Sequence, residues 1–338
     1  MRKIVIGILL YPGFQLLDIA GPRNAFGQVQ LQGEHPYEIV TIATTRLSLR
    51  SACGLAVIAD HHIFEPCPTL DTLIVPGGAG VFDVYEDRTL TDWLGGHVAR
   101  WRRLAAICNG VFVLGGAGLI ERRQVTSHWA DVPRLRAAYP RARLRPDAIC
   151  FKDGRLYTSA GASASIDLAL LLIEEDFGRT VARKVAKYLL VYLERPGAQG
   201  QFQPLVSRRP AADGQVQALR DYVLAHLDAP HSLASLASRV HMSPRNLTRL
   251  FSKQLGTTPM AFVSEARIDA ARDLLENTEL SIADIARRCG VESADSLRRL
   301  FSKRLGVSPL DYRQRFGSAS SLSPASPGKT CSLTPLQA

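Results

Sequence analysis

Three absences narrow the classes of protein to which this 338-residue sequence can belong. It contains no run of about 18 apolar residues, so we expect no membrane-spanning helix. Its six cysteines form no CxxC pair and follow no regular spacing, which argues against a disulfide framework and a zinc site. Residues 1–13 join a basic start to a short apolar run without a small-residue cleavage pattern, which favours a buried strand over a signal peptide. We therefore expect a cytoplasmic protein with reduced thiols, no metal and no cofactor.

The C-terminal third repeats one pattern twice, 50 residues apart. Residues 247–259 read LTRLFSKQLGTTP and residues 297–309 read LRRLFSKRLGVSP. Each copy follows a short helical pattern, at 232–244 and 281–293. A short helix, a tight turn and a second helix with one apolar and one basic face form a helix-turn-helix. Two such units would enter successive major grooves if their recognition helices lay about 34 Å apart.

The two faces of each second helix differ in chemistry. At 100° per residue, Leu247, Leu250 and Phe251 share one side, while Arg245 and Arg249 lie on the other. Residues 213–317 carry 15 Lys and Arg against 12 Asp and Glu, so basic residues must gather on one face to bind phosphate. The alternative is a helical domain with merely solvated basic faces. The duplication, with matching Gly and Pro, favours DNA binding.

These features resemble the DNA-binding domain of AraC/XylS-type transcriptional regulators, including the ending LGVSPLDYRQRF. The resemblance implies an all-α double helix-turn-helix domain over 215–317 that binds double-stranded promoter DNA. It also implies RNA polymerase as a partner and a homodimer. An acid at one of the base-facing positions is repelled by phosphate unless it accepts from a cytosine amino group. The implied base-facing positions are Arg245, Thr248, Arg249, Asp295, Ser296, Arg298 and Arg299.

The first two hundred residues alternate between strand and helix patterns. Such alternation predicts an α/β layered sandwich with a parallel sheet. The expected strands are 3–11, 37–44, 72–78 and 104–108. The expected helices are 14–29, 89–102, 109–119, 129–139 and 162–176. A segment rich in Pro and Gly, 194–214, predicts a linker after a first domain at 1–193, and the small polar segment 318–338 predicts a disordered tail.

The chemically suggestive point is Cys108, where an apolar strand runs into an Asn-Gly turn and an apolar helix. This pattern is typical of a nucleophile elbow, and the dipole of the following helix favours a thiolate. Gly77 and Gly78 end another strand and would let backbone N–H groups approach an anion. His128 and Asp18 are further candidates for the same site.

These elements resemble the ThiJ/PfpI group of class I glutamine-amidotransferase-like domains. The motifs are DIAGP at 18–22, PGG at 76–78, the Cys108 elbow, TSHW at 126–129 and TSAG at 158–161. The resemblance implies a flavodoxin-like sandwich. Peptidase-like members carry His directly after the nucleophile, where this chain has Asn109, so a protease dyad is not implied. An acid at the position of Asp18 also occurs in the isonitrile hydratase branch.

Several roles remain open for the candidate residues. Cys108 is an inert pocket thiol, a redox or electrophile sensor, or a catalytic nucleophile. His128 is a structural hydrogen-bonding residue or a general base, and Asp18 caps a helix, bonds a backbone turn or contacts a ligand.

The fusion predicts a transcriptional regulator, expected to be an activator, whose first domain binds a small nitrogenous effector. The alternatives are a Cys-dependent hydrolase or hydratase fused to a DNA-binding domain, and a constitutive DNA-binding protein. The expected ligand-binding residues are Asp18, Gly77, Gly78, Cys108, Asn109 and His128.

Overall fold

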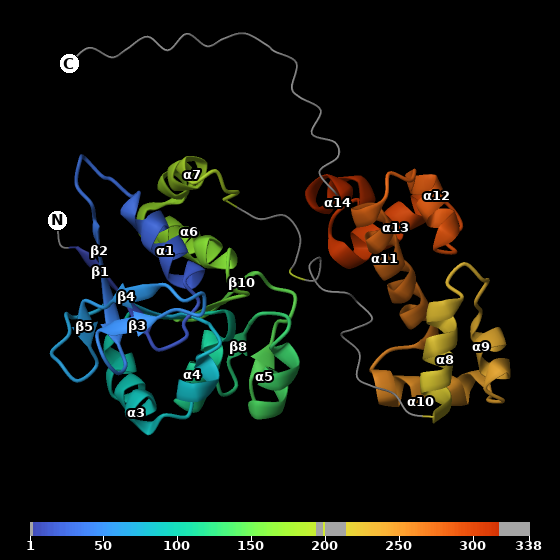
Figure 1. Cartoon of the computed structure of the whole chain (residues 1–338), viewed down its shortest axis with the longest axis horizontal. Helices are drawn as coiled ribbons and strands as arrows, with labels where there is room; N and C mark the ends of the chain where they lie inside the picture. Colours follow the sequence, from blue (N-terminus) through green and yellow to red (C-terminus); the bar gives the residue numbers. More distant parts are fainter. Residues whose placement is uncertain (1–2, 194–198, 200–213, 318–338) are drawn as a thin grey trace, which may run out of the picture. The chain divides into compact units, whose positions relative to one another are not determined.

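The computed structural model describes residues 3–193, 199 and 214–317, which form two compact units divided at residue 202 (Figure 1). The expected tail, 318–338, lies outside the described residues, as does most of the expected linker, 194–214. Two residues of that expected linker are described. Gln199 packs within the first unit, and Gly214 opens a helix of the second.

The first unit is built on a seven-stranded sheet in the order β10-β11-β7-β6-β1-β2-β5. All neighbouring pairs are parallel except β10 with β11. The apolar runs that predicted strands form the sheet centre, where β1, β6 and β7 are almost wholly buried. The strands of the sheet are β1 (Ile4–Leu10), β2 (Tyr37–Ala43), β5 (His61–His62), β6 (Thr72–Val75), β7 (Arg103–Ile107), β10 (Cys150–Asp153) and β11 (Leu156–Ser159).

Helices cover both faces of this sheet, as expected for an α/β sandwich. Figure 1 shows α1, α6 and α7 on one face and α3 with α4 on the other. The helices are α1 (Leu17–Gly27), α2 (Val81–Val84), α3 (Arg88–His97), α4 (Val111–Gly116), α5 (Val132–Ala138), α6 (Ala164–Phe177) and α7 (Arg179–Tyr188). Two small ladders lie apart from the main sheet: β3 (Ser48–Arg50) with β4 (Ala56–Ile58), and β8 (Gln124–Val125) with β9 (Arg143–Leu144).

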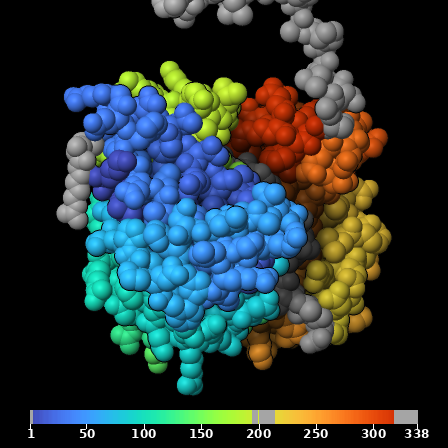
Figure 2. Space-filling view, turned by 60° about the vertical axis from the view of Figure 1, so that its left-hand side comes forward, coloured from blue at the N-terminus to red at the C-terminus, as the bar shows by residue number. Residues whose placement is uncertain are grey.

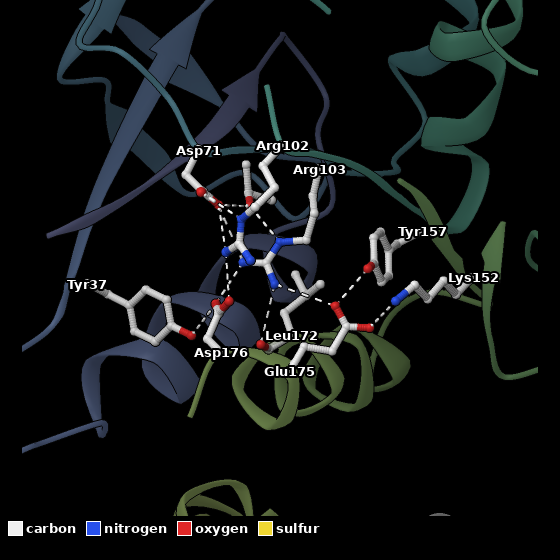
Figure 3. Close-up of polar contacts among 10 residues, drawn as sticks. Tyr37, Asp71, Arg102, Arg103, Lys152, Tyr157, Leu172, Glu175 and Asp176 are labelled. Atoms are coloured by element: carbon white, nitrogen blue, oxygen red, sulfur yellow. Dashed lines mark hydrogen bonds and ion pairs between the residues drawn. The ribbon is translucent and has the colours of Figure 1, made fainter. Parts of the chain in front are cut away.

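An ionic cluster joins α6 to the amino ends of β6 and β7 (Figure 3). The Arg103 side chain is only 3% exposed, and its Nη2 lies 2.7 Å from Oδ2 of Asp176, which is 2% exposed. Arg102 also bonds Asp176, at 2.6 Å, and Asp71, at 2.8 Å. The cluster pairs its buried charges with one another, which is the condition under which charges are tolerated in an interior. It lies at the opposite edge of the sheet from the residues expected to form the site.

The second unit is entirely helical within its described residues, 214–317. Its helices are α8 (Gly214–Ala225), α9 (Leu233–Arg239), α10 (Pro244–Leu255), α11 (Pro259–Asn277), α12 (Ile282–Arg288), α13 (Ala294–Leu305) and α14 (Pro309–Phe316). Ser243 caps α10 and Ser293 caps α13, each accepting a backbone N–H with its hydroxyl. Gly256 and Gly306 then end these two helices with left-handed φ values of 64° and 73°. The repeated Ser and Gly residues therefore begin and end α10 and α13 in the same way.

The two helix-turn-helix units have separate hydrophobic cores. Phe251 and Phe262 pack edge to face in the first core, and Phe301 with Tyr312 in the second. Helix α11 runs between the two groups and contributes residues to both cores (Figure 1). At 1.5 Å per residue its 19 residues span about 28 Å, close to the separation of successive major grooves. Among the described residues, no helix is long and apolar enough to cross a membrane.

Candidate functional site

The predicted site residues of the first unit gather at the carboxyl edge of the sheet. Strands β1, β6, β7 and β11 are parallel, so their carboxyl ends meet at one edge. Cys108 follows β7 directly, and Gly77 and Gly78 follow β6. Ligands of open α/β sheets bind outside this edge. The topology therefore places the candidates where a ligand site is expected.

Cys108 forms the predicted elbow. Its φ is 57°, a left-handed value that is uncommon for a residue other than glycine and marks local strain. Ser127 donates its hydroxyl to the Cys108 carbonyl at 2.9 Å, which holds the turn. Gly161 lies so close that a Cβ on it would be 2.3 Å from the Cβ of Cys108. Only glycine fits at position 161, because any side chain would displace the elbow.

The predicted thiolate at Cys108 is wrong. Burial raises the pKa of this thiol far above its usual range, and the nearby carboxylates of Asp18 and Asp131 raise it further. The N–H of Asn109 favours the thiolate but does not offset these effects. A 3-10 turn over Cys108–Gly110 leads into the short helix after the elbow. The dipole of this helix favours the thiolate, but burial and the two nearby acids oppose it more strongly. At neutral pH the thiol is protonated.

The amides of Gly77 and Gly78 are not free to hold an anion, which corrects the expectation drawn from the sequence. The Gly77 N–H donates to Oδ2 of Asp18 at 2.8 Å. The Gly78 N–H donates to Oδ1 of Asn109 at 2.8 Å, and the Asn109 amide returns a bond to the Gly78 carbonyl. Asn109 therefore has a structural task at the position where peptidase-like relatives carry His.

Asp18 is completely buried. Burial raises its pKa to about 7, although the N–H groups of Gly77 and Ala162 offset part of that cost. Its Oδ1 atom accepts no hydrogen bond within the described structure. A buried acceptor without a partner costs free energy, so a donor supplied from outside would be favourable there.

A cavity of about 290 Å³ lies beside the elbow. His128 is the one residue of the six predicted ligand contacts that lines it, while Cys108 adjoins it through Gly161. The Nδ1 of His128 accepts the Ala130 N–H, and burial lowers the pKa of the ring, although the nearby Asp131 offsets part of that effect. The lining residues are His128, Trp129, Ile149, Ala160, Gly161, Ala162, Ser163, Ala164 and Gln199.

Gln199 is the residue of this cavity with the least local signal in the sequence. It is 3% exposed, although it lies in a stretch whose composition predicts a linker. No periodicity surrounds it, so nothing local in the sequence indicates burial. In the described part of the chain, no group of three His, Cys, Asp or Glu side chains is placed to hold a metal.

The first recognition helix, α10, presents the expected faces. Leu247, Phe251 and Leu255 are buried, while Arg245 and Arg249 are exposed. Thr248 is half-buried, and its hydroxyl donates to the backbone carbonyl of Pro244 within the helix. The two arginines are therefore the long, accessible donors of α10.

The second recognition helix, α13, repeats this arrangement with one difference. Arg298 and Arg299 are exposed, and Ser296 accepts a long bond from Arg299 at 3.5 Å. Asp295 forms an ion pair with Arg298 at 2.7 Å, with both side chains largely exposed. The acid that phosphate would repel is thus paired with an arginine of its own helix.

Two family models match the chain. One described as the DJ-1/PfpI family covers residues 2–175, and one described as a helix-turn-helix domain covers residues 236–315. The ThiJ/PfpI family protein from Pseudomonas syringae has a solved structure with a TM-score of 0.52 and 25% identity, covering 67% of this chain and 87% of that one.

Curated relatives match both halves together. The HTH-type transcriptional regulator GlxA of Rhizobium meliloti is 30% identical over 297 residues, covering 85% of this chain and 89% of that protein. The HTH-type transcriptional regulator GbdR of Pseudomonas aeruginosa is 29% identical, covering 85% of this chain and 78% of that protein. The isonitrile hydratase of Pseudomonas putida is 34% identical but covers only 53% of this chain, with 75% of that protein.

Proposed function

This chain belongs to the DJ-1/PfpI family and is an effector-responsive helix-turn-helix transcriptional regulator, and we propose that the cavity beside His128 is its effector site. The observation that carries the proposal is the 290 Å³ cavity at the carboxyl edge of the sheet, next to the Cys108 elbow. The effector proposed is a small nitrogenous metabolite, because the buried acid Asp18 faces the N–H of Ala162, a residue of the cavity wall. Of the residues expected to contact the effector, His128 lines the cavity and is proposed as a contact, and Gln199 is proposed as a further one. Asp18 and Cys108 do not line the cavity.

We also propose that the first unit binds its effector without turning it over. A nucleophilic thiol needs a thiolate, and burial with two nearby acids opposes ionisation of Cys108. An oxyanion hole needs free N–H donors, and those of Gly77 and Gly78 are already bonded. The competing function is hydration of an isonitrile, suggested by the relative that matches the first half. Turnover that disappears in Cys108→Ala would support that function instead.

The seven predicted base-facing positions are proposed as the DNA contacts, with Arg249 and Arg299 as the principal readers. Two recognition helices about one helical turn of DNA apart predict two sites spaced by about 10 base pairs on one face of the duplex. Inserting five base pairs between them turns one site to the far side. Footprinting of the full chain should then show protection of only one site. Full protection of both sites would contradict the proposed docking.

We propose a homodimer that activates transcription in the cytoplasm through RNA polymerase. The segment around β3 and β4, the light-blue surface at the front of the first unit in Figure 2, exposes several large apolar side chains. They are Leu47, Leu55, Ile58 and Phe64. Light scattering at micromolar concentration checks the dimer, and an Ile58→Asp variant should be monomeric if this surface forms the contact.

The experiment that tests the effector site is a thermal-shift screen of metabolites on the full chain. The best compound is then tested against a His128→Leu variant. Loss of the thermal shift, with the variant's own melting temperature unchanged, would support the site. A thermal shift of equal size in the variant would place the effector elsewhere.

A further inference from the structure

Gln199 is fixed to the first unit by both its backbone and its side chain. Its N–H donates to the Asp147 carbonyl at 3.1 Å. Its Nε2 lies 2.9 Å from the Ser127 carbonyl, 3.2 Å from the Ala148 carbonyl and 3.2 Å from the Thr126 hydroxyl. Three acceptors surround this atom, so it is the amide nitrogen and the oxygen points elsewhere.

The amide oxygen of Gln199 has no partner. Oε1 is buried and accepts no hydrogen bond within the described structure. The residue as a whole is 97% buried yet lines the cavity with His128 and Trp129. Buried acceptors are almost always satisfied in native proteins, so an orphan acceptor at a cavity wall points to a missing donor.

The cavity wall restricts what that donor can be. No lining residue is an Asp, Glu, Lys or Arg, and burial lowers the pKa of His128, which disfavours its charged form. A carboxylate or phosphate would therefore leave water without a cation to pair with, which is costly. A group with an N–H donor would supply the hydrogen bond that the Gln199 oxygen lacks, and its positive charge would suit the acid Asp18, which faces the N–H of Ala162 in the cavity wall.

We propose that Gln199 is a specificity-determining contact of the effector site, and that its Oε1 accepts a hydrogen bond from an N–H group of the effector. The inference rests on the proposed function and deepens it, because it names the chemistry that the cavity selects. Neutral amides and N–H cations fit this site, and anions and fully methylated ammonium ions do not.

The test uses the full-length protein and small probes of defined chemistry. Acetamide, ethylammonium and guanidinium carry N–H donors, tetramethylammonium carries the charge without a donor, and acetate is the anion. Binding is followed by the NMR shift of the Trp129 indole N–H, identified with a Trp129→Phe variant. The expected result is that the three N–H probes bind at least tenfold more tightly than the other two. Equal binding of ethylammonium and tetramethylammonium would overturn the role of Gln199, and this arm needs no variant of Gln199.

A second arm removes the acceptor with Gln199→Met, which keeps the length of the side chain. The matched control is Gln30→Met, because Gln30 is an exposed glutamine of the same unit that bonds only His35 among the described contacts. We expect about tenfold weaker binding of the N–H probes to Gln199→Met and no change in the control. Unchanged binding to Gln199→Met, while the wild-type cavity still prefers N–H probes, would overturn the inference and leave the effector site standing. If no probe shifts Trp129 in the wild type, the proposed site and the inference both fail.

Discussion

Asp18 accepts the Gly77 N–H with one oxygen of its carboxyl group and leaves the other oxygen without a partner. The bond ties the loop after β6 to α1 at the centre of the site. The unpaired oxygen is completely enclosed, and burial raises the pKa of Asp18 to about 7. An acid maintained at such a cost is typical of a functional site rather than of a stable core.

Asp18 should make one contribution to the pH dependence of stability. Its pKa is about 7 in the folded unit and about 4 in an unfolded chain, so the folded state binds this proton more tightly. The stability that follows from the tighter binding of this proton is fully present below about pH 4, and it is lost as the pH rises through about 7. An Asp18→Asn variant lacks this loss. The free energy of unfolding of the variant, relative to that of the wild type, should therefore rise by roughly 2–4 kcal/mol between pH 4 and pH 8. Chemical unfolding at a series of pH values measures this difference.

The control for this prediction is Asp83→Asn, at an exposed acid on α2 of the same unit. Its stability should follow the wild type at every pH. A constant difference between Asp18→Asn and the wild type would show that Asp18 ionises normally in the folded protein.

The buried Arg103 should be important for folding of the first unit. Replacing it with Met leaves the enclosed carboxylate of Asp176 with fewer partners, for which we expect a cost of about 3 kcal/mol in the free energy of unfolding. Arg141 pairs with Glu121 on the surface, so Arg141→Met should cost less than about 1 kcal/mol. Denaturant unfolding of both variants measures the contrast, and equal costs would refute the role of burial.

The same cluster predicts sensitivity to acid. Burial opposes ionisation of Asp71, but its bonds to Arg102 and to Thr72 outweigh burial and hold its pKa below the usual range. The stability from this pair is present above about pH 4 and is lost as the pH falls through the lowered pKa. Arg102→Met should therefore flatten the decline in melting temperature below pH 4. An unchanged decline would contradict the assignment.

Among the described thiols, Cys53 rather than Cys108 should react first with an alkylating reagent. A hydrogen bond between the Ser51 hydroxyl and the thiol lowers the pKa of the exposed Cys53, whereas burial raises that of Cys108. Brief treatment with iodoacetamide at pH 7, followed by peptide mass mapping, should show at least tenfold faster labelling of Cys53. Ser51→Ala should slow it. Faster labelling of Cys108 would restore the elbow thiol as a reactive group.

Arg249 and Arg299 occupy matching, exposed positions on the two recognition helices, α10 and α13. Either change to Ala should cost about 1–3 kcal/mol of promoter binding if the residue reads a base, and should relax preference at one base pair. A residue that only contacts phosphate would instead weaken binding to all sequences. Titrations against operator variants distinguish the two, and Lys253→Ala on α10 serves as a comparison. Unchanged affinity and specificity in both arginine variants would show that α10 and α13 do not face the DNA.

Much of the architecture could be predicted from short-range patterns. The apolar runs predicted β1, β2, β6 and β7, and the duplicated Gly and Pro marked α10 and α13. The edge strand β10, the small ladders and helix α7 were not predicted, because they are short or polar and depend on packing. The elbow at Cys108 could be read from its neighbours in the sequence, since a strained turn is a local feature.

The electrostatics of the site could not be predicted in this way. The pKa of Cys108 depends on Asp18 and Asp131, which the fold brings to it from distant positions. Similarly, nothing beside Gln199 indicates that its amide bonds Ser127 and Ala148 across the unit. A local rule, such as thiolate stabilisation at a helix start, failed because burial outweighed it.

The most direct test of the account is the reciprocity between effector and DNA. For the compound selected by thermal shift, the factor by which it changes the DNA affinity of the full chain must equal the factor by which DNA changes its own affinity. We expect a factor of at least five in both titrations, and none in a 214–317 fragment that lacks the cavity. A compound that binds the cavity while DNA affinity stays the same would contradict the claim that this cavity controls DNA binding.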